Sequence, residues 1–167
     1  MDQDAAISAI ESVVQDPIEG LPEELFLFVS RITPLINVDL LIQDEAGRTL
    51  LTWRDDEYFG KGWHIPGGII RYKETAAERI QACARQELGA EVSFDPAPLL
   101  VLETIRPHRN RGHFISLLHH CRLRTPPEED LQAADTHPPA AGAWRWHEGA
   151  PPDLLEIQAP YARFFRC

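Results

Sequence analysis

Residues 60–92, with the sequence GKGWHIPGGIIRYKETAAERIQACARQELGAEV, constrain the fold more than any other part of this 167-residue chain. A Pro-Gly-Gly triplet is followed by two isoleucines, and residues 75–88 are rich in Ala, Glu, Gln and Arg. Gly89 comes directly after them, at a position where glycine commonly ends a helix. The pattern therefore predicts a glycine loop, a short strand and then a helix over residues 75–88.

The same segment carries candidate ligand-binding residues. Gly67 and Gly68 lack side chains, so their backbone can approach a ligand closely. Glu74 lies at the entrance of the predicted helix and Glu87 lies near its end. Carboxylates placed beside such a loop are candidates for holding a metal ion.

The remaining chain predicts a single α/β domain with a mixed sheet between helices. Helical periodicity is found over residues 4–14 and 153–165, the latter interrupted near Pro160, and strand patterns cover residues 35–42, 48–53, 91–106, 113–124 and 143–147. Residues 44–47 are predicted to be the turn of a hairpin, and the Pro- and Ala-rich residues 125–143 a loop. We divide the chain into an N-terminal helical extension, residues 1–30, and one domain, residues 31–167.

The charge composition of the chain disfavours some kinds of binding partner. Sixteen Lys and Arg against 26 Asp and Glu give a net charge of −10, which disfavours nucleic acid and anionic membrane surfaces. A phosphorylated substrate therefore needs a local group of cations. The longest apolar run, residues 25–29, is far below the ~20 residues of a membrane span, and the acidic start MDQD does not resemble a signal peptide. With three widely spaced cysteines, we expect a soluble cytoplasmic protein.

Residues 68–89 resemble the Nudix box, the loop-helix-loop that binds Mg²⁺ and nucleoside diphosphates. The resemblance rests on Gly68, a five-residue gap, Glu74, and then Glu87-Leu88-Gly89 in the same frame. The box usually has an Arg-Glu pair where this chain has Ala82 and Cys83, and the first of its paired glutamates is Gln86. The family implies a Nudix-like α/β/α sandwich with a mixed sheet.

One branch of that family, the GDP-mannose mannosyl hydrolases, is similar to this chain beyond the box. The stretch RITPLINVDLLIQDEAGRTLLTWR, residues 31–54, resembles its first hairpin, and GWHIPGG resembles its approach to the box. That branch has a shortened box, uses one divalent ion and cleaves the sugar C–O bond. The chain has Ile69, Ala82 and Phe114 where the branch has Arg, Arg and Tyr. The resemblance also implies a homodimer. The predicted N-terminal helix is suited to exchange between the two subunits of such a dimer.

The branch implies roles for particular residues. Glu87 would be a ligand of Mg²⁺ or Mn²⁺, with the backbone carbonyl of Gly67 or Gly68 as a second ligand, and we include Glu74 in the metal set. His137 would be the general base, and Asp39 and Arg54 would be the catalytic pair of the first hairpin. Thr136 stands where the branch has an amide ligand.

Other candidates come from the residues themselves. Asp39 interrupts the apolar run of residues 35–42, where a carboxylate is unusual without a partner. Arg106, Arg109 and Arg111 bring three guanidiniums together, either to bind a diphosphate with Arg54 or as a solvated hairpin tip. Trp63 precedes the glycine loop and is a candidate substrate contact.

The identity of the general base stays open among three histidines. His137 lies in a Pro-rich loop, where a histidine is ordinarily solvated, and His108 and His113 are alternatives. Cys83 shares its helix with Ile80 and Ala84, and we interpret it as a packing residue.

These observations favour Mg²⁺-dependent hydrolysis of a nucleoside diphosphate sugar, resembling GDP-mannose, at its glycosyl carbon. A neutral imidazole would take a proton from the attacking water, and arginines would stabilise the departing nucleoside diphosphate. One alternative is cleavage at phosphorus with Glu74 and Glu87 on the metal. A second is a degenerate Nudix domain that binds a nucleotide without catalysis.

Overall fold

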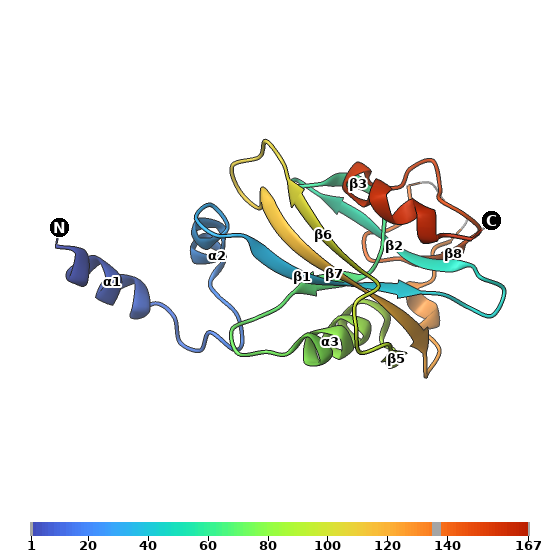
Figure 1. Cartoon of the computed structure of the whole chain (residues 1–167), viewed down its shortest axis with the longest axis horizontal. Coiled ribbons are helices and arrows are strands. Elements are labelled where there is room, and N and C mark those ends of the chain that lie inside the picture. The colour runs from blue at the N-terminus through green and yellow to red at the C-terminus, as the bar shows by residue number, and fades with distance from the viewer. Residues whose placement is uncertain (1, 135–137, 167) are drawn as a thin grey trace.

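Two β-sheets form the centre of the computed structural model, which describes residues 2–134 and 138–166 (Figure 1). The larger sheet has the order β4-β1-β7-β5, with β6 also paired to β7; the smaller has the order β3-β2-β8. The strands of the larger sheet are β1 (Leu35–Ile42), β4 (Gly67–Ile69), β5 (Val92–Phe94), β6 (Leu100–Ile105) and β7 (His113–Leu123). Those of the smaller sheet are β2 (Thr49–Asp56), β3 (Gly60–His64) and β8 (Trp144–His147). The β1 and β7 strands are parallel and the other pairs are antiparallel, which confirms the predicted mixed α/β fold.

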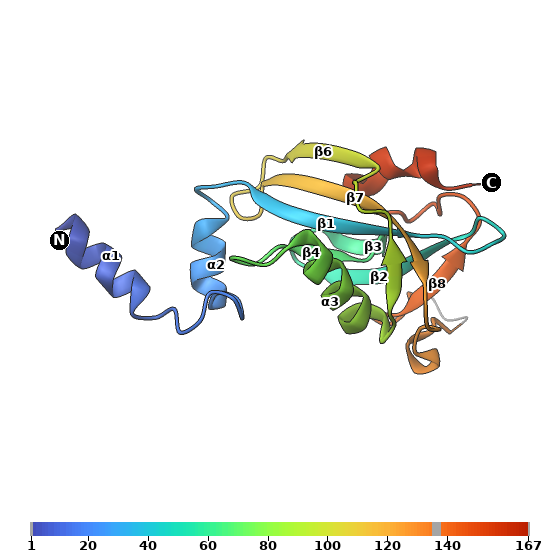
Figure 2. The same ribbon diagram turned by 60° about the horizontal axis from the view of Figure 1, so that its bottom comes forward.

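Helices lie on both sides of these sheets (Figure 2). The helical elements are α1 (Gln3–Glu11), α2 (Glu23–Val29), α3 (Ala76–Leu88) and two 3₁₀ segments, η1 (Glu129–Leu131) and η2 (Glu156–Phe164). Among the described residues, no helix has the length and apolar content that a bilayer crossing requires.

Helix α3 begins and ends where the sequence predicts. The Thr75 side chain accepts a hydrogen bond from the backbone N–H of Glu78, while the Glu78 side chain accepts one from the N–H of Thr75. This reciprocal capping box satisfies two N–H groups that a helix start otherwise leaves free. Gly89 ends the helix in the left-handed conformation, at φ 61°, which glycine adopts without strain.

We expect Thr75→Ala to lower the free energy of unfolding by about 1 kcal/mol, because it removes the side-chain acceptor of the cap. Urea unfolding followed by circular dichroism would measure this loss. Ser12→Ala is the control, because the Ser12 hydroxyl is exposed and bonds only to the Ala9 carbonyl three residues back. Equal stability of Thr75→Ala and the wild type would show that the box does not stabilise α3.

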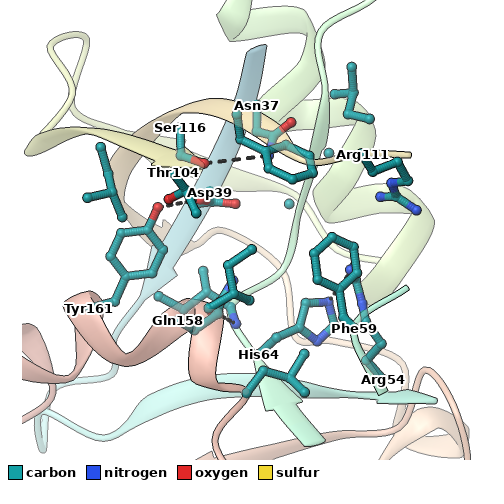
Figure 3. A pocket seen from close by; sticks show the side chains of 18 residues that line it. Asn37, Asp39, Arg54, Phe59, His64, Thr104, Arg111, Ser116, Gln158 and Tyr161 are labelled. Atoms are coloured by element: carbon teal, nitrogen blue, oxygen red, sulfur yellow. Dashed lines mark hydrogen bonds between the residues drawn. The ribbon is translucent and has the colours of Figure 1, made fainter. Parts of the chain in front are cut away.

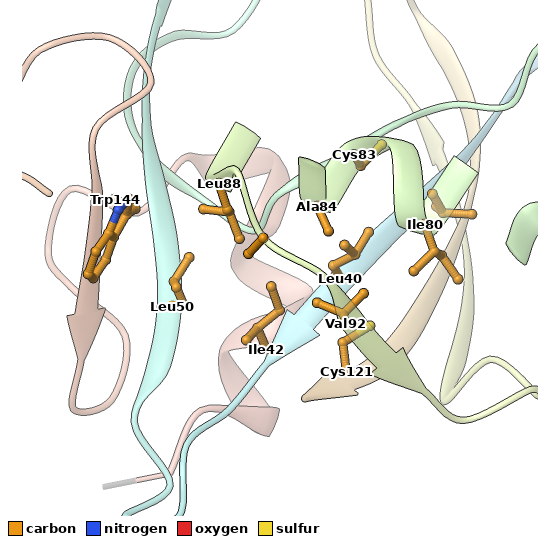
Figure 4. Packing of buried hydrophobic residues seen from close by; sticks show 12 residues of the cluster. Leu40, Ile42, Leu50, Ile80, Cys83, Ala84, Leu88, Val92, Cys121 and Trp144 are labelled. Carbon is orange, nitrogen blue, oxygen red and sulfur yellow. The ribbon is translucent and has the colours of Figure 1, made fainter. Parts of the chain in front are cut away.

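The buried face of α3 fixes the helix against the larger sheet. Ile80, Ala84 and Leu88 are fully buried and lie against Leu40 of β1 and Val92 of β5 (Figure 4). Burying a side chain of the size of Ile or Leu stabilises a fold by roughly 1.5–3 kcal/mol. The position of Glu87 on α3 is therefore set by this packing. A second core cluster joins the sheets to η2, with Tyr161 and Phe165 against Leu41 and Leu118.

The predicted pairing of residues 35–42 with residues 48–53 is wrong. The chain does turn at residues 44–47, but β1 and β2 enter different sheets and are joined only by the isolated bridge Gln43–Thr49. Since β1 is buried at every position from Val38 to Ile42, it takes strands on both sides, β4 and β7, instead of one hairpin partner.

Three further elements of secondary structure differ from the prediction. Residues 91–106 form two strands, β5 and β6, because Pro96 and Pro98 cannot donate to a sheet between them. The closing helix is the 3₁₀ segment η2, which tolerates Pro160 within it. The short helix α2 was not predicted. The division into an extension and a domain stays a prediction, although none of the α1 residues is buried.

Candidate active site

Glu87 meets Gly67 of β4, since the predicted glycine loop is a short strand paired with β1. The backbone N–H of Gly67 donates to Oε1 of Glu87 at 2.9 Å, and the Thr52 hydroxyl donates to Oε2 at 3.2 Å. Burial raises the pKa of Glu87 to about 7, against the opposing effects of the Gly67 N–H and the Arg54 guanidinium. The structure therefore brings together three of the predicted residues, Glu87, Gly67 and Arg54.

A buried histidine links Arg54 to the backbone of Thr52. His64 donates from Nδ1 to the Thr52 carbonyl at 2.8 Å, and its Nε2 lies 3.1 Å from Nη2 of Arg54, which donates to it. Burial, followed by the positive charge of Arg54, lowers the pKa of His64 to about 3, so the ring is neutral at physiological pH. A neutral ring with its proton on Nδ1 satisfies both contacts and fixes one end of Arg54.

His64 makes one contribution to the pH dependence of stability. Between pH 6.5 and 3 the unfolded chain binds a proton on His64 that the folded protein does not, so His64 lowers the free energy of unfolding as pH falls. Glu87, whose pKa burial raises to about 7, contributes in the opposite direction between pH 7 and 4.5. We expect His64→Asn, which keeps a donor for the Thr52 carbonyl, to reduce this loss by up to about 1.4 kcal/mol per pH unit.

Urea unfolding between pH 7 and 5 measures this loss. His147, whose pKa burial lowers to about 4, contributes in both proteins and cancels in the comparison. His108→Asn, on an exposed loop, is the control. The same pH slope in His64→Asn and the wild type would contradict the assignment.

Asp39 lies in a cavity of about 140 Å³ between the two sheets and η2 (Figure 3). The Tyr161 hydroxyl donates to Oδ2 of Asp39 at 2.6 Å, and both residues are buried. Burial raises the pKa of Asp39, while the hydroxyls of Tyr161 and Ser116 and the charge of Arg54 lower it. The expectation that Asp39 has a partner is thus confirmed, and the partner is Tyr161.

Three guanidiniums surround one aromatic ring at the edge of this cavity. The guanidinium carbons of Arg54, Arg106 and Arg111 lie 5.1, 4.7 and 5.0 Å from the centroid of Phe59. Asp56 is the carboxylate near this group, at 3.6 Å from Nε of Arg54. The aromatic face holds like charges together, and the result is a local positive site in an acidic chain. Figure 3 shows Arg54, Arg111 and Phe59 on one side of the cavity.

Two residues of the box have structural contacts instead. Glu74 accepts at 2.8 Å from both the Arg71 backbone N–H and Nε of the buried Arg79. Cys83 is buried beside Gly68, and burial, with the charge of Glu87, raises the pKa of its thiol to about 12. Cys83 belongs to the buried core cluster and contributes packing, as predicted.

Several predicted site residues lie elsewhere or outside the described residues. Trp63 is 3% exposed and packs edge-on against Trp53 in the core, so the structure does not bring it to the cavity. Arg109 is exposed at the hairpin tip. His113 lies 3.0 Å from Glu103, and His108 bonds to the Asn110 carbonyl. His137 and Thr136 lie outside the described residues.

Sequence reasoning missed four residues of the site. These are Phe59, His64, Ser116 and Tyr161. A signal was present for His64, since it lies between Trp63 and the glycine loop in the stretch that carries the resemblance. Tyr161 is 122 residues from Asp39, and no local pattern joins them.

A family model described as the NUDIX domain matches residues 33–165, so the chain belongs to the Nudix family. The low-salt glycan biosynthesis protein Agl8 of Haloferax volcanii is 32% identical over 79 residues, which are 47% of this chain and 50% of that protein. The match thus spans about half of that relative.

Two solved structures show the same fold. The MutT NUDIX hydrolase of Burkholderia pseudomallei has a TM-score of 0.61 at 18% identity, over 78% of this chain and 97% of that chain. A UDP-X diphosphatase has a TM-score of 0.55 at 15% identity, over 92% of this chain and 83% of that chain. The Nudix-like fold and the hydrolase class are confirmed at the level of the family.

Nudix hydrolases generally use a divalent ion such as Mg²⁺, and the residues here fit one ion better than a cluster. Within residues 2–134 and 138–166, no group of three or more His, Cys, Asp or Glu side chains is arranged to hold a metal. Of the box acids, Glu87 contacts Gly67 of β4, whereas Glu74 contacts Arg71 and Arg79. Mg²⁺ is commonly held by one or two carboxylates together with substrate phosphates, and a single carboxylate meets that requirement.

Proposed function

We propose that this protein hydrolyses a nucleoside diphosphate sugar, resembling GDP-mannose, at the glycosyl carbon and releases the sugar and the nucleoside diphosphate. The observation that carries the proposal is the arginine cluster around Phe59, directly beside the cavity that holds Asp39. A diphosphate matches the cluster, because guanidiniums pair with phosphate oxygens bidentately. The polar side chains that line the cavity can form hydrogen bonds with the hydroxyl groups of a sugar.

The contacts of Glu74 favour cleavage at carbon over cleavage at phosphorus. The phosphorus reaction considered above needs Glu74 and Glu87 on the metal, but Glu74 pairs with Arg79 at the start of α3. With Glu87 as the remaining acid, the charges best placed to act on the substrate are arginines, which stabilise a departing diphosphate.

In the proposed reaction the oxygen of water forms a bond to the anomeric carbon. The bond from that carbon to the diphosphate oxygen breaks, and its electron pair leaves with the nucleoside diphosphate. His137 takes the proton from water, and the anomeric centre is inverted. Asp39, held by Tyr161, stabilises positive charge that develops on the sugar ring, while Arg54, Arg106 and Arg111 bind the leaving group.

Mg²⁺ or Mn²⁺, when bound, neutralises charge on the diphosphate. Glu87 and the backbone carbonyl of Gly67 or Gly68 would hold it. The name of the Haloferax relative concerns glycan biosynthesis, which supports a sugar-containing substrate.

The proposal includes a homodimer in the cytoplasm. Exposed apolar residues of the N-terminal segment support the dimer, among them Ile7, Ile10 and Val13, since α1 buries none of its side chains in the monomer. The free cysteines Cys83 and Cys121 support a reducing compartment. Light scattering during size-exclusion chromatography would test the dimer, and a monomer would remove it from the proposal.

The test of the reaction is a product assay in ¹⁸O-labelled water with Mg²⁺ or Mn²⁺, on a panel of nucleoside diphosphate sugars. Free sugar carrying the label, together with unlabelled nucleoside diphosphate, is the expected result. Sugar phosphate with nucleoside monophosphate, and the label on phosphate, would show cleavage at phosphorus. Binding without turnover across the panel would favour a non-catalytic nucleotide-binding domain.

A further inference from the structure

We propose that the segment before the Nudix domain, α2 with Ser30, is part of the diphosphate-binding site because it positions Arg111. This inference rests on the proposed function in taking the arginine cluster as the diphosphate site. The family match begins at residue 33, so α2 and Ser30 lie outside the family domain. The inference therefore gives the N-terminal segment a role in substrate binding.

The first observation is a buried contact between Ser30 and the backbone of Arg111. The Ser30 hydroxyl accepts a hydrogen bond from the Arg111 N–H at 3.0 Å and donates to the Leu27 carbonyl at 2.7 Å. Ser30 is 5% exposed. Its hydroxyl therefore joins the last turn of α2 to the turn between β6 and β7.

The second observation is the conformation of Arg111. Its φ is 53°, in the left-handed region that residues other than glycine rarely adopt. Such a conformation persists where the surroundings hold it in place. The bond from its N–H to Ser30 supplies one such restraint, and the neighbouring bond from Arg31 to the Asn110 side chain, at 3.0 Å, supplies another.

The third observation is where this conformation places the Arg111 side chain. Its guanidinium carbon lies 5.8 Å from the ring of Phe26 in α2 and 5.0 Å from the rings of Tyr58 and Phe59. Its Nε is buried and has no hydrogen-bond partner among the described residues. A buried N–H of this kind is costly unless a ligand satisfies it, and Arg111 also lines the cavity of Asp39.

The position of α2 fits this role, and that of α1 does not. Helix α2 stands beside the connection between β6 and β7, while α1 extends away from the rest of the molecule (Figures 1 and 2). Ser30 is thus a positioning residue: it acts on the diphosphate through Arg111. Removal of its hydroxyl frees the Arg111 backbone without removing any charge.

The experiment is titration calorimetry of the full chain with GDP in MgCl₂, which requires no turnover. Ser30→Ala is expected to raise the Kd of GDP about fivefold to tenfold, within the range measured for coupled neighbouring residues. Ser30→Thr, which keeps the hydroxyl, is expected to restore binding. Ser12→Ala is the matched control, because the Ser12 hydroxyl also bonds to the carbonyl three residues back but touches no arginine.

A double-mutant cycle separates positioning from general destabilisation. Ser30→Ala is expected to have no further effect on the Kd in an Arg111→Ala background. Wild-type affinity in Ser30→Ala, or an equal loss in both backgrounds, would overturn the inference, as would wild-type affinity in Arg111→Ala. Thermal melting of each variant checks that it is folded. If the predicted GDP affinities hold but no sugar nucleotide is turned over, the proposed function fails and the positioning of Arg111 stands.

Discussion

Glu87→Gln is expected to lower kcat/KM by about 10³-fold at millimolar Mg²⁺, because the metal supplies several kcal/mol of charge stabilisation. Glutamine has nearly the same shape as glutamate, and its carbonyl oxygen can still accept from the Gly67 N–H. The variant therefore removes negative charge while keeping the contact with Gly67 of β4. A titration of activity with MgCl₂ should show a much higher metal requirement.

Gln86→Ala is the control for this prediction. Gln86 occupies the neighbouring box position, where the family usually has an acid, and its side chain is exposed. Its removal should leave the Mg²⁺ titration unchanged. If Glu87→Gln has the wild-type Mg²⁺ requirement, Glu87 is not the metal ligand, and its contacts with Gly67 and Thr52 are structural only.

His137→Ala is expected to lower kcat by ~10²–10⁴-fold, the usual contribution of a general base. KM should change little, because in the proposed reaction the arginines, and not His137, bind the diphosphate. Added imidazole should restore part of the activity by taking the proton in place of the missing side chain. Steady-state kinetics across pH, with and without imidazole, provides the measurement.

His108→Ala and His113→Ala test the two alternative bases under the same conditions. His113 lies beside Glu103, and Nδ1 of His108 contacts the Asn110 carbonyl. We expect both variants to keep wild-type kcat. A loss in either of them, with normal activity in His137→Ala, would assign the base to His108 in the β6–β7 connection or to His113 at the start of β7.

The sequence was sufficient for the parts of the site that local patterns determine. Helix α3 follows from its composition and from Gly89 at its end, whereas Gly67 lies in strand β4 and not in the predicted loop. The metal-ligand role predicted for Glu87 came from the resemblance of residues 68–89 to the Nudix box. Each of these features depends on residues within about one helix length of one another.

The parts that could not be predicted depend on contacts between distant residues. Nothing near Asp39 indicates Tyr161, which the packing of η2 brings to it. Strand β1 pairs with β4 and β7 instead of with the predicted hairpin partner, residues 48–53. This pairing likewise depends on the burial of β1 between distant parts of the chain. Trp63 was misplaced for the same reason, because the sequence does not show which aromatic residues pair in the core.

The parallel pairing of β1 with β7 has a consequence for the order of folding. Asn37 of β1 is in register with Ser116, 79 residues later, so closing this pair costs more loop entropy than closing a hairpin. High contact order of this kind slows folding. During synthesis on the ribosome, Asp39 would emerge long before Ser116 and Tyr161, and its carboxylate would stay hydrated until they arrive. The cavity lined by Asp39 is therefore among the last parts of the molecule to assemble, while α3 can form early from local contacts.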